Sequence, residues 1–174
     1  DRRDIMYNDF VILGPAADPA RIRGEKKVAT ALAKLAKAQA LFVTRGDNSG
    51  THVKEKELWQ AAKITPAGAW YVTFEKGAAG NAPTTRYANQ RQAYVLMDRA
   101  TYLTLKKEIS LQVLVEKDPD LLNYIAVIRM NGIIASYSST RAPKPVFDYY
   151  AVAAKGVTLH AVQGRFLSEE RRAA

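Results

Sequence analysis

The sequence predicts an α/β fold, and three observations lead to that prediction. Short apolar segments rich in β-branched residues alternate with alanine- and lysine-rich segments of helical periodicity from residue 9 to residue 130. Hydrophobic residues make up 48% of the chain, a composition typical of a packed domain rather than a disordered segment. The 174 residues suffice for one compact domain or two small lobes, and the alternation predicts mostly parallel pairing of the strands.

Each predicted element of the first half follows from its own residues. The apolar segment DFVILG is closed by Gly14 and Pro15, which is typical of a strand that ends in a turn. In EKKVATALAKLAKAQA, apolar residues recur at helical spacing with lysines opposite them, which indicates an amphipathic helix. The predicted elements, in order, are a strand at 9–14, a helix at 25–40, a strand at 41–44, a helix at 51–63 and a strand at about 70–74.

The second half continues the alternation and then becomes harder to interpret. A polar segment interrupted by glycine and proline is expected to form a loop that leads into a short helix, and Asp98 is placed to start a later one. The predicted elements are the loop at 76–91, a strand at 93–97, a helix at 98–107, and strands at 111–116 and 124–130. In the tail we expect a loop at 135–146 and a helix at 147–155.

The chain is basic, with 26 lysines and arginines against 17 acidic residues and a formal charge of +9. Nucleic acid, an anionic surface or a small anion would each fit that sign. The positive residues are scattered rather than gathered on one aromatic-rich face, so a solvated basic surface is favoured and no nucleic-acid partner is expected. No apolar run approaches the ~20 residues that span a bilayer, so membrane insertion is not expected either.

The stretch FVTRGDNSGTH, residues 42–52, joins a predicted strand to a predicted helix and contains many hydrogen-bond donors. The first backbone N–H groups of a helix have no intrahelical acceptor, and their partial positive charge favours an anion. Gly46 and Gly50 would let an anion approach the backbone, and the hydroxyl groups of Ser49 and Thr51 would add donors. This arrangement predicts a binding site for a small oxyanion.

Two charged residues of the same stretch extend that prediction. Arg45 offers a planar fork of donors that can take two oxygens of one oxyanion. Asp47 suits the turn, or alternatively holds Arg45 in orientation. The stretch matches neither a Walker loop nor a dinucleotide fingerprint. The alternative is that Ser49 or Thr51 simply caps the following helix, and composition alone does not decide between the two interpretations.

Four stretches carry a resemblance to a known family, in the family's order: MYNDFVILGPAADP (6–19), FVTRGDNSGTHVKEKELW (42–59), AYVLMDRATYL (93–103) and VEKDPDLLN (115–123). They are similar to the substrate-binding component of tungstate ABC transporters, within the periplasmic-binding-protein superfamily. The related phosphate-binding proteins hold their oxyanion with a similar Arg-x-Asp-x-Ser-Gly-Thr loop. The resemblance covers roughly residues 5–130.

The resemblance implies a periplasmic-binding-protein-like fold in which two α/β lobes close around an oxyanion, tungstate or molybdate first and phosphate or sulfate second. It implies that Arg45, Ser49, Gly50 and Thr51 form the anion contact from one lobe, with no other cofactor. We expect one complete anion-binding lobe at 9–97 and a partial second lobe at 98–174 together with 1–8. An ABC permease is the implied partner, and the implied location is periplasmic or extracellular.

The sequence also departs from the family's pattern. Family members carry an earlier Thr/Ser-rich anion loop, and this chain starts after it, so we expect half of the ligand shell to come from elsewhere. The family's Gly-rich stretch is replaced by GAAGNAPTTRYANQR, where Thr84, Thr85 and Arg86 are either polar ligand contacts or parts of a surface loop. His52 either orients the anion loop, adds a donor, or is an exposed residue of the first helical turn.

The remaining candidates have structural interpretations. Asp98 is most simply an N-cap, with a hinge or cleft role for Asp98–Arg99 as the alternative. Tyr7 and Asn8 fall where the resemblance places the first crossover between lobes. Trp59 and Trp70 are expected to be packing residues rather than ligand contacts. His160 has no spaced partner, so no metal site is expected there.

No catalytic constellation is found in the sequence. Ser49 lacks the G-x-S-x-G elbow, and the two histidines of the chain do not stand in a triad pattern. The absence of cysteine excludes a disulfide framework, thiol catalysis and a cysteine-based zinc site. An enzyme is therefore not expected. The alternative to solute capture is a binding or regulatory module that kept the fold without the ligand and binds an anionic polymer through its positive charge.

Overall fold

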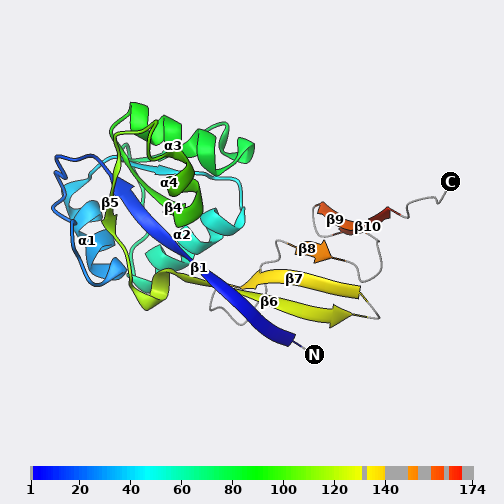
Figure 1. Cartoon of the computed structure of the whole chain (residues 1–174). Coiled ribbons are helices and arrows are strands. Elements are labelled where there is room, and N and C mark those ends of the chain that lie inside the picture. Colours follow the sequence, from blue (N-terminus) through cyan, green and yellow to red (C-terminus); the bar gives the residue numbers. More distant parts are fainter. Residues whose placement is uncertain (1, 131–132, 140–148, 153–157, 163–164, 170–174) are drawn as a thin grey trace. The chain divides into compact units, whose positions relative to one another are not determined.

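The computed structural model describes residues 2–130, 133–139, 149–152, 158–162 and 165–169 (Figure 1). The chain divides into two compact units, one of residues 9–122 and one of residues 1–8 with 123–174. It passes from one unit to the other directly after Asn8 and again directly after Leu122. Residues 98–122, which we expected with the second lobe, group instead with residues 9–97, because the strand at 112–115 pairs with the strand that contains residues 12–14.

The unit of residues 9–122 is built on five strands in the order β5-β1-β4-β2-β3. Their bounds are Arg2–Gly14 for β1, Phe42–Thr44 for β2, Tyr71–Thr73 for β3, Tyr94–Asp98 for β4 and Gln112–Val115 for β5. Strand β2 pairs in parallel with β3 and β4, whereas β1 is antiparallel to both β4 and β5. The prediction of mostly parallel pairing is therefore wrong, and the sheet is mixed. The neighbours of β1 in this sheet are β4 and β5 rather than β2, the next strand in the sequence, so the alternation of strands and helices does not fix its direction.

Helices cover both faces of this sheet. Their bounds are Val28–Ala38 for α1, Gly50–Ala61 for α2, Asn81–Gln90 for α3 and Arg99–Leu105 for α4, with short 3₁₀ turns η1 at Gly77–Ala79 and η2 at Pro119–Leu121. Alternate residues of β1 point to opposite faces: Phe10 and Ile12 join one apolar cluster, and Val11 and Leu13 join the other. The uninterrupted apolar run in the sequence thus reflects burial on both sides.

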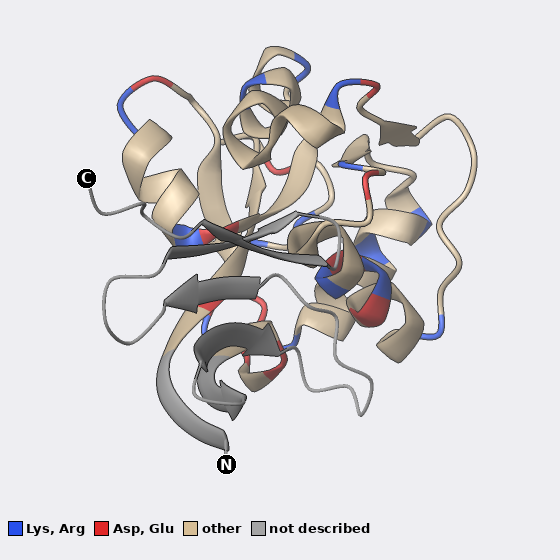
Figure 2. Cartoon of the chain, turned by 90° about the vertical axis from the view of Figure 1, so that its right-hand side faces the viewer, with Lys and Arg blue, Asp and Glu red and all other residues tan. Residues whose placement is uncertain are grey.

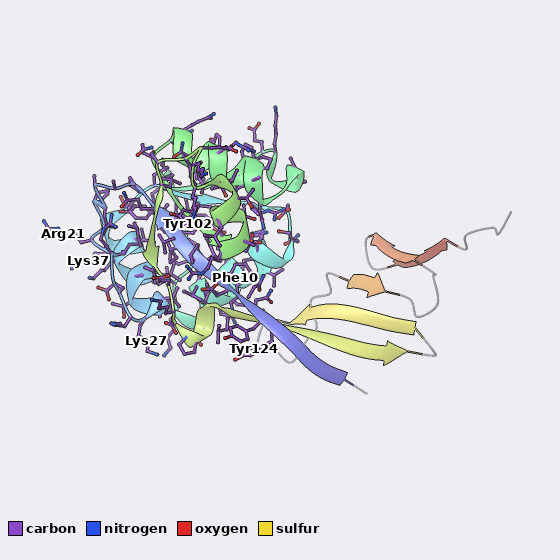
Figure 3. The ribbon with its side chains drawn as sticks, viewed as in Figure 1. Phe10, Arg21, Lys27, Lys37, Tyr102 and Tyr124 are labelled. Atoms are coloured by element: carbon purple, nitrogen blue, oxygen red, sulfur yellow. The ribbon has the colours of Figure 1, made fainter. Side chains whose placement is uncertain are left out.

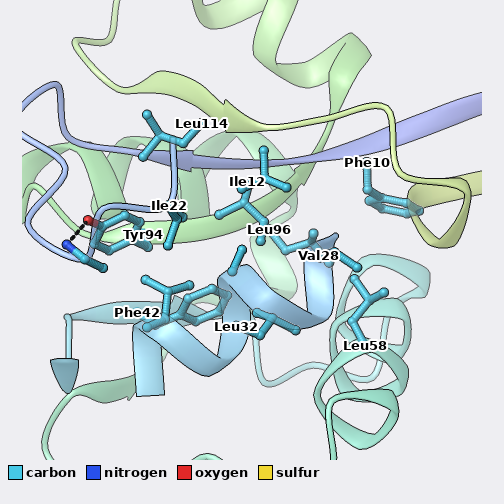
Figure 4. Packing of buried hydrophobic residues seen from close by; sticks show 14 of the residues in the cluster. Phe10, Ile12, Ile22, Val28, Leu32, Phe42, Leu58, Tyr94, Leu96 and Leu114 are labelled. Atoms are coloured by element: carbon cyan, nitrogen blue, oxygen red, sulfur yellow. Dashed lines mark hydrogen bonds between the residues drawn. The ribbon is translucent and has the colours of Figure 1, made fainter. Parts of the chain in front are cut away.

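The first cluster lies between the sheet and the helices α1 and α2. Figure 4 shows Ile12, Leu32, Phe42 and Leu96 packed together there. The second cluster lies on the face covered by α3 and α4, with Ala88 of α3 fully buried and Tyr102 of α4 packed against it. The helices and strands predicted between residues 9 and 116 are confirmed. Their bounds shift by one to three residues, except that the first strand, predicted at 9–14, already begins at Arg2. The predicted loop at 76–91 is largely helical, since α3 accommodates Pro83 in its first turn.

The other unit contains strands that follow one another in antiparallel pairs. Their bounds are Leu122–Met130 for β6, Ile133–Ser139 for β7, Tyr149–Val152 for β8, Thr158–Val162 for β9 and Arg165–Glu169 for β10. The helix predicted at 147–155 is wrong, because residues 149–152 form β8 between two partner strands. The loop predicted at 135–146 is wrong for residues 135–139, which belong to β7. Residues 140–148 lie outside the described residues.

Arg99 joins the segments through which the chain enters and leaves the larger unit. Its guanidinium donates from Nε and Nη2 to the carboxylate of Asp9, at 2.8 and 2.6 Å, and Nη2 lies 2.8 Å from a carboxylate oxygen of Glu116. The hydrogen bonds that Arg99 donates to Asp9 outweigh burial and raise the pKa of Arg99. Arg99 therefore ties β1 to the end of β5.

Replacing Arg99 with alanine is expected to lower the free energy of unfolding by about 1–3 kcal/mol, because two partly buried carboxylates lose a charged donor. Arg86→Ala is the matched control: its ion pair with Glu108 is exposed, and its loss is expected to cost less than about 1 kcal/mol. Urea denaturation of both variants measures the difference. Equal losses would show that the Arg99 cluster is no more than a surface pair.

Candidate functional site

Arg45 lies buried beneath the turn that connects β2 to α2, with 9% of its surface exposed. Its Nη2 donates to Asp47 Oδ2 at 2.5 Å and to the carbonyl of Gly77 at 3.2 Å, and its Nη1 donates to the side-chain oxygen of Asn81. Its Nε is buried and has no hydrogen-bond partner among the described residues. The guanidinium thus holds three turns together and retains an unused donor.

Asp47 connects Arg45 to the start of α2. Its Oδ1 accepts from the backbone N–H of Ser49 at 3.1 Å and from the Ser49 hydroxyl at 2.7 Å. Burial opposes the charged form of Asp47, but the hydrogen bonds from Ser49 and the attraction of Arg45 outweigh it and lower the pKa of this carboxyl. Asp47 therefore has both roles that the sequence left open, because it accepts from the backbone of the turn at Ser49 and also holds Arg45 in orientation.

The start of α2 carries backbone donors that no side chain caps. Ser49 occupies the N-cap position without a side-chain cap bond, and the Thr51 hydroxyl donates to Asn81 at 3.2 Å instead. The first helical hydrogen bond runs from the N–H of Val53 to the carbonyl of Ser49 at 2.8 Å, so the N–H groups of residues 50–52 precede it. The interpretation that Ser49 or Thr51 simply caps the helix is therefore wrong. This helix end keeps its partial positive charge.

A second helix start meets the first at Asn81. This residue opens α3, which also has no side-chain cap. The Asn81 side-chain oxygen accepts from Arg45 and Thr51, and its amide nitrogen donates to Asp98 Oδ2 at 2.6 Å. Asn81 therefore brings the polarised starts of α2 and α3 together. Sequence reasoning missed this residue, and the proline two positions later was the available signal for a helix start.

Two glycines allow the turns to approach this closely. Gly46 has φ +68°, and a Cβ on it would lie 2.3 Å from Cγ2 of Thr73. A Cβ on Gly77 would lie only 1.8 Å from the carbonyl oxygen of Arg45. A side chain at Gly77 would displace the Arg45 backbone, so Gly77 is a second site residue that the sequence did not identify.

His52 orients the loop rather than standing free in the first helical turn. Its Nδ1 accepts the N–H of Asn48 at 2.9 Å, while Lys56 donates to the Asn48 side chain at 2.8 Å. Burial and the nearby positive charge of Lys56 lower the pKa of His52. The neutral imidazole is the form that can accept this bond. His52 and Lys56 thus hold the outer part of the turn.

The other predicted contacts serve local structure. The hydroxyls of Thr84 and Thr85 donate to the carbonyls of Gly80 and Asn81, both at 2.9 Å, inside the buried start of α3. The alternative that they belong to a surface loop is therefore wrong. Arg86 is exposed and pairs with Glu108.

Asp98 and the two tryptophans have the structural roles predicted for them. Asp98 accepts from the N–H of Thr101 at 2.8 Å, which confirms it as the N-cap of α4. Trp59 is 2% exposed, and the rings of Trp59 and Trp70 meet at 5.8 Å. Both are therefore packing residues.

The remaining predicted residues lie outside the anion loop. Asn8 accepts a hydrogen bond from the Asn123 side chain at 2.7 Å, and the ring of Tyr7 lies 6.4 Å from that of Tyr124. His160 falls in β9, and its side chain lies outside the described part of the chain. Within the described part, no three histidine or carboxylate side chains gather as a metal site would require.

The charged residues and the helices of the described part of the chain show no further candidate site. Lys and Arg are interspersed with Asp and Glu in the view of Figure 2 rather than gathered in one basic stripe. None of the described helices combines the length and apolar character of a membrane span.

Comparisons with known proteins place these features in context. Residues 1–138 match a family described as "PBP superfamily domain". Over 133 residues the chain is 41% identical to the tungstate-binding protein TupA of Peptoclostridium acidaminophilum, covering 75% of this chain and 46% of that protein. The chain thus spans between a third and a half of the length of the curated relatives it matches.

Solved structures give the same result. The tungstate ABC transporter structure from Geobacter sulfurreducens superposes with a TM-score of 0.65 at 44% identity, covering 72% of this chain and 52% of that chain. The tungstate-binding protein TupA from Desulfovibrio alaskensis G20 gives a TM-score of 0.63 at 44% identity, with the same coverage of both chains. These relatives are named for binding and transport rather than for catalysis.

Proposed function

The chain belongs to the PBP superfamily, and from that premise we propose that it captures a tetrahedral oxyanion as an extracytoplasmic solute-binding protein, or as part of one. Tungstate or molybdate is the first candidate, and sulfate or phosphate is the second. The partner would be an ABC permease, and the location periplasmic or extracellular. The function is binding without chemistry.

The observation that carries this proposal is the uncapped start of α2 beside a buried arginine. A side chain that is nine-tenths buried keeps an unpaired Nε, and the adjacent helix end presents N–H groups ahead of its first hydrogen bond. Unsatisfied buried donors cost free energy, and they are retained where something else satisfies them. An anion bound at the helix end would satisfy the N–H groups there, beside the positive charge of Arg45.

The proposed mechanism replaces the water shell of the anion with fixed donors. A dianion loses its hydration only if many hydrogen bonds match it at once. The N–H groups of Gly50 and Thr51 point out of the helix end, and the hydroxyls of Ser49 and Thr51 can rotate from their present acceptors toward the ligand. Arg45 adds positive charge from beneath the turn, where Asp47 and Asn81 fix its orientation. These donors form the contact from one lobe, and the resemblance implies a second set from the other.

Isothermal titration calorimetry of the protein with sodium tungstate and sodium molybdate tests the proposal. We expect one anion per protein, with an affinity that changes little between low and moderate salt because the ligand is buried. The alternative of binding to an anionic polymer predicts DNA affinity that falls steeply with salt through counterion release. DNA binding of that kind, with no binding of any oxyanion, would overturn the proposal.

Asp47 leads to a prediction about selectivity. Hydrogen phosphate carries a proton that needs an acceptor, whereas the Asp47 carboxylate already accepts from Arg45 and Ser49. Phosphate is therefore expected to displace tungstate at least about tenfold less well than sulfate, which has the same charge and no proton. Competition calorimetry near pH 8 measures how well phosphate and sulfate each displace tungstate. Phosphate that competes as well as sulfate would mean that Asp47 turns to the ligand.

A further inference from the structure

Strand β3 forms one edge of the sheet in the unit of residues 9–122. The N–H of Phe42 donates to the carbonyl of Trp70, and the N–H of Phe74 donates to the carbonyl of Thr44, so residues 70, 72 and 74 face β2. Because successive residues of a strand face opposite sides, the N–H and carbonyl of Thr73 and the carbonyl of Tyr71 face away from the sheet. No partner for these three groups is found within the described residues.

A groove of about 440 Å³ runs beside this edge. One wall consists of five consecutive residues from β3 and the segment after it, residues 72–76. The opposite wall consists of one face of α3, with the spacing i, i+3, i+4 and i+7: Pro83, Arg86, Tyr87 and Gln90. A groove between a free strand edge and a helix face can accept an extended chain that adds to the sheet.

The groove contains both apolar contact area and positive charge. The rings of Phe74 and Tyr87 stack across it with centroids 4.6 Å apart, and both are only partly buried. Lys76 on the strand side and Arg86 on the helix side are both exposed, and Arg91 lies over the Tyr87 ring at 5.6 Å. Glu75 also lines the groove and Glu108 pairs with Arg86, so the three cations exceed the acidic groups beside them by one. The groove therefore favours apolar residues that alternate with acidic ones.

We propose that the groove between β3 and α3 binds an extended, acidic segment of a partner protein, which pairs with the outward backbone groups of Thr73 and Tyr71. Its apolar side chains would pack on the Phe74–Tyr87 pair, and its carboxylates would meet Lys76 and Arg86. The proposal concerns a different surface from the anion loop and does not depend on oxyanion binding.

A fluorescein-labelled peptide of eight residues that alternates valine and glutamate is the probe. We expect it to bind the protein at least about tenfold more tightly than the peptide in which lysine replaces glutamate. A valine–glutamate peptide methylated on its backbone nitrogens should lose binding, because it cannot donate to the strand edge. The N–H resonance of Thr73 should shift on addition of the unmethylated peptide.

Two variants with a matched control complete the test. Thr73→Pro removes the outward N–H, and Arg86→Glu reverses a charge on the helix wall; each is expected to weaken peptide binding at least about tenfold. Lys37→Glu makes the same charge change on α1, where Figure 3 shows the side chain away from α3, and should bind like the unchanged protein. Circular dichroism confirms folding of each variant.

Three results would overturn the proposal. In the first, the methylated peptide binds as tightly as the unmethylated one. In the second, Lys37→Glu weakens peptide binding as much as Arg86→Glu does. In the third, the Thr73 N–H resonance shifts when the protein is concentrated without peptide, and sedimentation shows dimers. The last result would assign the edge to a second copy of the chain.

Discussion

Replacing Arg45 with alanine is expected to weaken tungstate binding by about a hundredfold or more. Charged hydrogen bonds contribute roughly 1.5–3 kcal/mol each, and the guanidinium supplies both the positive charge under the turn and the orientation of its neighbours. Its removal leaves Asp47, Asn81 and the Gly77 carbonyl without a shared donor, so only the Thr51–Asn81 hydrogen bond still joins the starts of α2 and α3. Calorimetry with tungstate measures the loss.

A control is needed because the same substitution also removes structural bonds. Arg21→Ala deletes an exposed arginine and so changes the net charge equally, and it should bind tungstate as the unchanged protein does. Arg45→Lys keeps the positive charge but lacks the planar guanidinium with its paired donors. Its tungstate affinity is expected to lie between those of Arg45→Ala and Arg21→Ala. Thermal unfolding of each variant shows whether the fold survives. Wild-type affinity in a folded Arg45→Ala protein would show that the anion binds elsewhere.

The sequence was informative about this loop because its signals are local. A strand, two glycines, two hydroxyls and a helix occur within eleven residues, and each type constrains the backbone beside it. Composition left open the roles of Asp47 and of the Ser49 hydroxyl, and the hydrogen bond between them decides both. The direct contact of these residues with an anion remains a prediction.

The parts that the sequence did not predict depend on distant partners. Asn81 lies 36 residues from Arg45, and nothing in the spacing announces their contact. The segment FDYYAVAAK contains alanines that favour a helix, yet its tyrosines and valine suit a strand, and pairing with β7 and β9 decides the outcome. Likewise, β1 pairs with β4 and β5, which are distant in the sequence, so its own residues do not indicate its direction.

The second large effect concerns Glu55, an acidic residue enclosed in the core. It lies on α2, is 3% exposed, and accepts a hydrogen bond of 2.5 Å from the Tyr71 hydroxyl. Burial raises the pKa of Glu55 to about 7 from 4.5, against the hydrogen bond from Tyr71 and the attraction of Lys56. The folded protein therefore binds this proton more tightly than the unfolded chain does.

The sign of the pH dependence follows from that difference. The stabilisation that the tightly bound proton of Glu55 gives the folded state is complete below pH 4.5. It declines as the pH rises toward the pKa of Glu55 in the folded protein, and it is lost above about pH 7. A shift of this size corresponds to roughly 3 kcal/mol between the two limits. Glu55→Gln keeps the shape and can still accept from Tyr71, but it does not titrate. Urea denaturation from pH 4.5 to 8 should therefore show the variant gaining stability relative to the unchanged protein as the pH rises.

Glu57→Gln is the matched control, since Glu57 lies on the same helix and is less buried. It makes the same chemical change outside the buried site and gives the baseline for the comparison. A difference between Glu55→Gln and the unchanged protein that stays constant with pH would mean that Glu55 is ionised in the core throughout. In that case a positive charge would have to compensate it there, and α2 would be held in place by an ion pair rather than by a neutral hydrogen bond to β3.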